Sequence, residues 1–273
     1  MNDRFHKKDR REKTGAFPRD RREQEASEVD ETLVYGRNAV KELLSSGRDV
    51  DKILTARGDR DGSITVLVAT AIDRKIPVIE VDRKKLDSMT GVTTHQGIVA
   101  MTPAREYSTI DDVLSYAAEK GESPLIAVCD CVEDPHNLGA IIRSAECAGF
   151  HGLIIGKRHS ATLNATVAKA SAGAIEHLRI VKVTNLPTAI DELKEKGVWI
   201  YGADMGGNAY YDTDLKGSVA IVMGNEGKGL SRLVEEKCDF IVSIPQYGNV
   251  SSMNVSAAAA VLFCEAAKQH HKN

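Results

Sequence analysis

Six short apolar segments recur between residues 124 and 245, and their pattern constrains the fold more than any other feature of the chain. Each segment is apolar on both faces, and stretches with helical spacing intervene between them. Strands of this kind must be covered on both sides, which indicates a mostly parallel sheet between layers of helices. The predicted strands are 125–132, 152–156, 179–183, 198–204, 218–224 and 239–245.

The loops that follow these strands are the candidate binding loops. Ligands of open parallel sheets bind beyond the carboxyl ends of the strands, because the helix starts and loops of the fold meet there. Four loops with suitable composition are 133–139, 205–213, 224–230 and 245–253.

A second, smaller α/β domain is predicted upstream, since 273 residues are enough for two domains that each bury a core. Helix and strand patterns alternate through residues 32–104. The predicted elements are a helix at 35–45, a strand at 52–56, a helix at 63–74, a strand at 76–81, a short helix from 83 and a strand at 95–101. A linker and helix at 105–122 then lead into the larger domain, 123–273.

Charge is unevenly distributed along the chain, although the net charge is only −3. Residues 1–22 carry nine bases and four acids, whereas residues 23–31 carry five acids and no base. This tail has almost no large aliphatic side chains, so we expect residues 1–31 to be disordered. The tail is either a solvated arm or an arm that scans a polyanion. The mildly acidic total argues against binding nucleic acid by bulk electrostatics alone.

Location and metal content also follow from composition. No apolar run approaches the roughly 18 residues that a membrane span needs, and the N-terminus lacks the apolar core of a secretory signal. Five cysteines, an odd number, indicate reduced thiols in the cytoplasm. Because the cysteines and histidines lack metal-ligand spacing, we predict no metal site.

Loop 224–230 is rich in glycine but does not match the common nucleotide-binding motifs. A Walker loop would need Lys and Ser/Thr at 230 and 231, where the chain has Leu230 and Ser231. Glu226 would also repel phosphate from within the loop. Neither a G-x-G-x-x-G fingerprint after the first strand of the large domain nor a G-x-S-x-G elbow is present.

Several polar residues near these loops each have two readings. Ser252 or Asn254 could be no more than the N-cap of the last helix, since caps favour these residue types. Asn137 could be a turn or cap residue, and Arg143 a solvated charge on a helix. The glycines of the 224–230 loop nevertheless allow close approach of a ligand to the backbone, and the combination favours a binding site.

Three segments in order resemble the three motifs of the SpoU/TrmH RNA ribose 2′-O-methyltransferases. They are Asn137–Gly149, Gly224–Ser231 and Ile244–Ser256. Residues 35–40 (YGRNAV) and 95–97 (HQG) are similar to the branch that modifies guanosine in large-subunit rRNA. Two positions differ mildly from the family pattern: Met253 stands where Leu is common, and Gln246 where Met is frequent.

The resemblance implies a fold, a cofactor and an assembly. The larger domain would be a SPOUT methyltransferase domain with a deep trefoil knot, and the small domain a ribosomal-protein-like module that binds RNA. S-adenosylmethionine would be held by Gly224, Ile244 and Met253. The protein would be a homodimer, with Arg143 of one copy completing the site of the other.

The implied reaction is methylation of the ribose 2′-hydroxyl of a guanosine in 23S rRNA. The polar positions that match the family motifs are Asn137, Arg143, Glu226, Ser252 and Asn254. An ordinary guanidinium stays protonated, so Arg143 is expected to bind phosphate or polarise the 2′-oxygen. Glu226, Ser252 and Asn254 would orient the site, and Asn137 would hold the loop. Alternatives are a tRNA ribose methyltransferase, a resistance-type rRNA methyltransferase and, from another class, a catalytically silent RNA-binding assembly factor.

Overall fold

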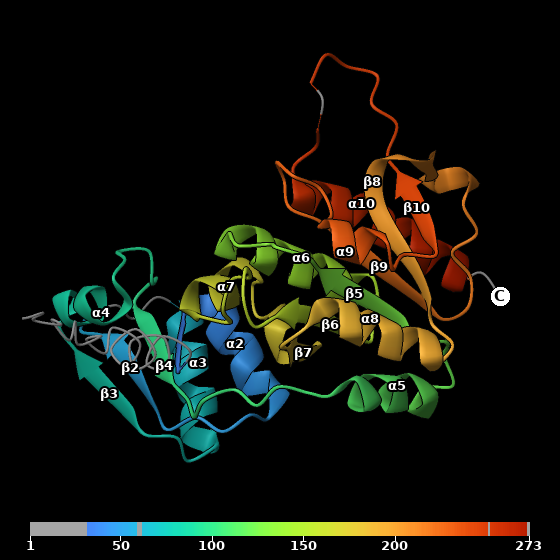
Figure 1. Ribbon diagram of the computed structural model, residues 1–273. Coiled ribbons are helices and arrows are strands. Elements are labelled where there is room, and N and C mark those ends of the chain that lie inside the picture. Colours follow the sequence, from blue (N-terminus) through green and yellow to red (C-terminus); the bar gives the residue numbers. More distant parts are fainter. Residues whose placement is uncertain (1–31, 59–61, 251, 272–273) are drawn as a thin grey trace, which may run out of the picture.

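The computed structural model describes residues 32–58, 62–250 and 252–271, and they form two sheets with their own helices (Figure 1). The predicted disordered tail, 1–31, lies outside the described residues. Within them, no helix is both long enough and apolar enough to span a bilayer.

The first sheet has four strands in the order β1-β4-β2-β3. Strand β4 pairs antiparallel with β1 and β2, and β2 pairs parallel with β3. Two faces of this sheet are covered, because separate apolar clusters gather around Leu43 and Leu86, which are both fully buried. The elements are β1 (Leu33–Tyr35), α2 (Arg37–Ser46), β2 (Lys52–Ala56), α3 (Gly62–Asp73), β3 (Val78–Val81), α4 (Arg83–Thr90) and β4 (Ile98–Met101).

The second sheet has six parallel strands in the order β10-β8-β9-β5-β6-β7. Helix α5 (Ile110–Glu119) leads into it and starts with a capping box between Thr109 and Asp112. The strands are β5 (Leu125–Cys129), β6 (Gly152–Gly156), β7 (Arg179–Val183), β8 (Trp199–Ala209), β9 (Val219–Met223) and β10 (Phe240–Ser243). The helices between and after them are α6 (Pro135–Cys147), α7 (Ala165–Ala170), η1 (Ala174–Glu176), α8 (Leu186–Glu195), η2 (Tyr210–Asp212), α9 (Arg232–Glu235) and α10 (Val255–His270).

Strand β5 lies inside this sheet and is buried on both faces, as its sequence predicts. Leu125, Ala127 and Cys129 belong to one apolar cluster, and the alternate residues Ile126 and Val128 belong to another. This alternation arises because successive side chains of a strand point to opposite faces. The α/β class predicted from the sequence is confirmed. The trefoil knot stays a prediction, since strand order and register describe pairing and not how the chain crosses itself.

The structure corrects several element boundaries. The stretch 165–177 reads as one helix but is divided into α7 and η1, because Ala172 and Gly173 have φ values of 51° and 92°. Residues 33–35 form a strand before the first helix, and β4 begins only at Ile98. Strand β8 runs on to Ala209, past an irregularity in its pairing with β10.

Candidate active site

A cavity of about 390 Å³ lies where strands β8, β9 and β10 end. Its walls come from the carboxyl ends of these strands, from the loop after β9 and from the first turns of α10. This is the position that parallel topology predicts for a ligand site. Apolar side chains of Met223, Val242, Ile244 and Leu262 line it together with polar groups of Asp204 and Glu226.

The loop after β9 forms one wall and closes on itself. The backbone N–H of Asn225 donates to the carbonyl of Gly229, and the N–H of Gly229 donates back to Asn225, both at 2.9 Å. Gly224 packs directly against the backbone of Gly229 and Leu230, which leaves no room for a Cβ atom. A glycine is therefore required at position 224 for the loop to keep this shape.

The two residues that follow strand β5 anchor the same loop, although the sequence motifs did not single them out. The buried Asp130 carboxylate accepts from the backbone N–H of Ser231 at 2.6 Å. The Asn225 amide donates to the Cys131 carbonyl at 3.0 Å and accepts from the Gly227 N–H at 3.0 Å. Asp130 is the single charged residue within the predicted apolar strand 125–132, and that is the sequence signal that points to this role.

Three of the predicted polar residues meet at the edge of the cavity. The Asn137 amide donates to Glu226 Oε1 at 3.0 Å. The Asn254 amide donates to Asn137 Oδ1 at 3.0 Å and also to Glu226 Oε1. Since the three residues come from α6, the loop after β9 and the start of α10, this network connects three separate elements.

Asn254 has both of the roles that the sequence allowed. It is the N-cap of α10, with Oδ1 accepting from the backbone N–H groups of Ser256 and Ala257 at 3.0 and 3.3 Å. Its amide nitrogen is left to bind Asn137 and Glu226. Asn137 itself is not a cap: it lies inside the first turn of α6, and Asp134 caps that helix.

The remaining predicted cofactor residues also line the cavity. Gly224, Ile244 and Met253 all contribute to its wall, and so does Ser252. Asp204 and Met205 of β8 also line the cavity, and sequence reasoning missed both. Both belong to β8, which continues further than its apolar pattern indicates. Asp204 falls at the end of the predicted strand 198–204, and Met205 opens the candidate loop 205–213.

Arg143 is not brought to this cavity. It lies six residues after Asn137 on α6, with an exposed side chain, and does not line the cavity. Within the part of the chain that the structure describes, its guanidinium has no hydrogen bond or ion pair. Six positions correspond to about one and two-thirds turns, so Arg143 and Asn137 cannot point to the same side of α6.

Three cysteines of this domain are poor nucleophiles at neutral pH. Burial, with help from the Asp130 charge, raises the pKa of Cys131 to about 11 and that of Cys129 to about 12. Burial likewise raises the pKa of Cys238 to about 12. Among residues 32–58, 62–250 and 252–271, no three His, Cys, Asp or Glu side chains are grouped so as to hold a metal ion.

Comparisons with known proteins agree with this arrangement. Residues 124–264 match the model of the SpoU rRNA Methylase family, and residues 33–108 match the model described as RNA 2′-O ribose methyltransferase substrate binding. The chain is 42% identical over 244 residues to a Staphylococcus aureus protein assigned to the TrmH family of tRNA/rRNA methyltransferases, covering 89% of this chain and 98% of that protein. It is 44% identical over 234 residues to the TrmH family protein YacO of Bacillus subtilis, covering 85% and 93%.

A solved structure has the same architecture. The SpoU methyltransferase AviRb from Streptomyces viridochromogenes, in complex with its cofactor AdoMet, superimposes with a TM-score of 0.75 and 25% identity, covering 93% of this chain and 95% of that one. Fold and site thus define an α/β methyltransferase with a separate substrate-binding domain. The chain belongs to the SpoU/TrmH family of RNA methyltransferases.

Proposed function

We propose that the protein transfers a methyl group from S-adenosylmethionine to the ribose 2′-hydroxyl of a guanosine in 23S rRNA. The observation that carries the proposal is the Asn137–Glu226–Asn254 network at the edge of a cavity formed by strand ends. The match of residues 33–108 to a substrate-binding model for RNA 2′-O ribose methylation supports the ribose as acceptor. The guanosine and the large-subunit RNA rest on the resemblance of residues 35–40 and 95–97.

The cavity suits S-adenosylmethionine in size and chemistry. Its volume of about 390 Å³ lies within the roughly 300–1,000 Å³ usual for ligands of this size. Met223, Val242 and Leu262 offer an apolar surface for the adenine, while peptide groups of Gly224–Gly229 offer hydrogen-bond partners. When bound, the cofactor supplies an activated methyl group on a sulfonium sulfur.

The chain's own residues position the acceptor and assist loss of its proton. Glu226 accepts two amide hydrogen bonds, which fix its carboxylate at the cavity edge. Ser252 lines the cavity and offers a hydroxyl to the incoming ribose. We assign to Arg143 the binding of phosphate or the polarisation of the 2′-oxygen. Positioning an acceptor in line with its methyl donor accounts for much of the rate of such reactions.

We further propose that the enzyme is a homodimer. Arg143 is exposed on α6 and lies outside its own cavity. A second copy placed against α6 would bring this guanidinium to the partner's site. Sedimentation analysis of the purified protein tests the assembly, and a monomer with full activity would refute it. An rRNA substrate would place the enzyme in the cytoplasm.

Label transfer tests the reaction. Purified protein is incubated with methyl-labelled S-adenosylmethionine and, separately, with 23S rRNA, 16S rRNA and tRNA, and labelled nucleotides are mapped. We expect label in the ribose of one 23S guanosine. Label in tRNA would instead favour the tRNA enzyme, in keeping with relatives described as tRNA/rRNA methyltransferases. Cofactor binding without transfer to any RNA would favour a silent assembly factor.

A further inference from the structure

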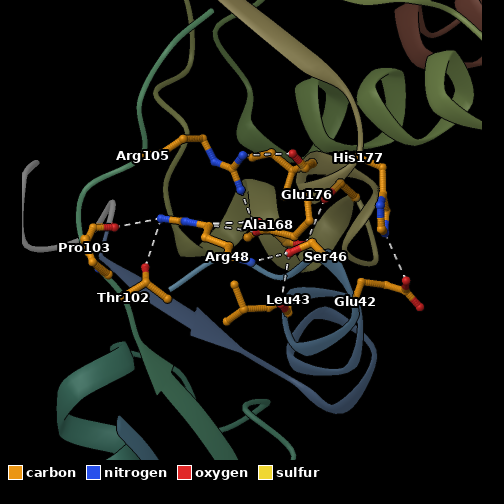
Figure 2. A network of polar contacts seen from close by, with 12 residues as sticks. Glu42, Leu43, Ser46, Arg48, Thr102, Pro103, Arg105, Ala168, Glu176 and His177 are labelled. Carbon is orange, nitrogen blue, oxygen red and sulfur yellow. Dashed lines mark hydrogen bonds and ion pairs between the residues drawn. The ribbon is translucent and has the colours of Figure 1, made fainter. Parts of the chain in front are cut away.

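A buried ionic cluster joins the small domain to the methyltransferase domain, with Glu176 at its centre (Figure 2). The Glu176 side chain is only 2% exposed. Arg48 Nη1 lies 3.4 Å from Glu176 Oε1, and Arg105 Nη2 lies 2.6 Å from the same oxygen. Arg48 belongs to the small domain, between α2 and β2, whereas Arg105 belongs to the segment that leaves it. The Glu176 carboxylate therefore binds both the small domain, through Arg48, and the linker that follows it, through Arg105.

The two arginines also bind the backbone around the joint. Arg48 Nη2 donates to Thr102 Oγ1 at 3.0 Å and to the Pro103 carbonyl at 2.7 Å. Arg105 Nη1 donates to the Ile175 carbonyl at 3.0 Å. Burial, followed by the neighbouring Arg105 charge, lowers the pKa of Arg48, and Glu176 opposes both effects. Without Glu176, two guanidinium groups would face each other in a buried place with no counter-charge.

Close packing surrounds the ionic cluster. Gly173 has no room for a Cβ atom because the Glu42 side chain of α2 lies against it. His177 Nε2 lies 3.1 Å from Glu42 Oε2, and Lys169 Nζ donates to the Thr94 carbonyl at 2.9 Å. These contacts come from α7, from the turn at Gly173 and from the end of η1, and the turn exists because the helical pattern of 165–177 is broken there.

Helices α7 and α6 connect this ionic cluster to the active site. Gly139 of α6 packs against Ala170 of α7 so closely that a Cβ atom would clash. Two residues earlier on α6, Asn137 binds Glu226 at the cavity edge. The orientation of the small domain is thus set relative to the helix that also orients the site.

We propose that Glu176 is a positioning residue for RNA methylation, which holds the small domain in one orientation so that bound RNA reaches the cavity at a fixed offset. This inference rests on the proposed function of the two domains. If RNA must contact the small domain and the cavity together, a small domain free to rotate would be in the binding-competent orientation in only a fraction of the molecules. The apparent affinity for substrate falls in proportion to the competent fraction.

The test is Glu176→Gln, which keeps the shape of the side chain and removes its charge. Removing one partner of a buried ion pair is strongly destabilising to the contact, so we expect KM for RNA to rise by about tenfold or more. Affinity for S-adenosylmethionine and kcat at saturating RNA should stay unchanged. Small-angle scattering should show a larger radius of gyration. The matched control is Asp191→Asn, which removes a half-buried ion pair with Lys237 inside the methyltransferase domain.

Arg48→Lys is the second variant, and it keeps the charge but not the planar fork that binds Glu176, Thr102 and Pro103 together. It should raise KM for RNA by less than Glu176→Gln does. Unchanged RNA affinity in both variants would overturn the inference, as would an expanded shape with unchanged KM. RNA affinity is measured in parallel with turnover. Absence of methyl transfer by the unaltered protein would then refute the proposed function separately.

Discussion

Asn254 offers a substitution that separates the stability of a helix from the geometry of the site. Its Oδ1 caps α10, and its amide nitrogen binds Asn137 and Glu226. Asn254→Ala removes both functions. Asn254→Ser keeps the cap, because serine caps helices about as well as asparagine, but its short hydroxyl cannot replace the amide donor. Comparing the two variants therefore assigns each effect to one half of the side chain.

The two variants should differ in Tm but not in the rate of methyl transfer. Loss of an N-cap costs about 1 kcal/mol, which for a protein of this size lowers Tm by about 2–4 °C. Asn254→Ala should show this shift, and Asn254→Ser should melt like the unaltered protein. A hydrogen bond to a charged group is worth about 1.5–3 kcal/mol. If that stabilisation is expressed in the transition state, both variants should lose about 10- to 100-fold in methyl transfer.

Single-turnover label transfer to rRNA measures the rate, calorimetry measures affinity for S-adenosylmethionine, and circular dichroism measures Tm. A slow Asn254→Ser enzyme with normal Tm and normal cofactor affinity would support the network as part of the site. Normal turnover by Asn254→Ser together with slow turnover by Asn254→Ala would refute this reasoning, because only the start of α10 would then matter.

Three further predictions address the other parts of the site. Arg143→Ala should lose methyl transfer with unchanged Tm and cofactor affinity, since the side chain is exposed and unpaired among the described residues, and normal turnover of this variant would contradict the role. Arg143→Lys should also be inactive if the planar fork is needed. Gly224→Ala should weaken cofactor affinity and cost about 1–3 kcal/mol in stability, because its Cβ would overlap the backbone of Gly229; unchanged calorimetry would contradict this. Burial lowers the pKa of His151 although Glu122 opposes the shift, so the unfolded chain binds a proton at this side chain more tightly than the folded chain does. The free energy of unfolding should therefore fall as pH drops below about 6.5, and urea titrations at pH 7.5 and 5.5 should show a smaller pH effect for His151→Gln.

The sequence predicted most of the larger sheet because its strands are buried on both faces. Segments 152–156 and 179–183 match β6 and β7 to the residue. The small domain's first strand, Leu33–Tyr35, was not predicted, because three residues are too few to show a period. The helical pattern over 165–177 is broken at Ala172 and Gly173, where φ is positive. The packing of Glu42 from the small domain against Gly173 is a tertiary contact that leaves no local signal.

The candidate site was predictable to the extent that its residues follow strands. Glu226 and Asn254 stand in loops at strand ends, so topology alone brings them to one edge. Asp130 and Glu176 act through partners far away in the sequence, Ser231 and Arg48, so only the folded chain reveals them. The position of Arg143 could be predicted from the sequence, because its spacing of six residues from Asn137 on one helix indicates that the two side chains point to different sides.

The loop Asn225–Gly229 is closed by its own two hydrogen bonds, and this affects how a ligand enters. A wall that is already ordered adds little entropy cost to binding. The amides of Asn225 and Gly229 should therefore exchange slowly with deuterium even before the cofactor arrives. The cavity lining outside this loop includes the exposed residues Met205 and Gln246. Ordering on binding should concentrate there, and so entry and release of the cofactor should follow the movement of that part of the lining.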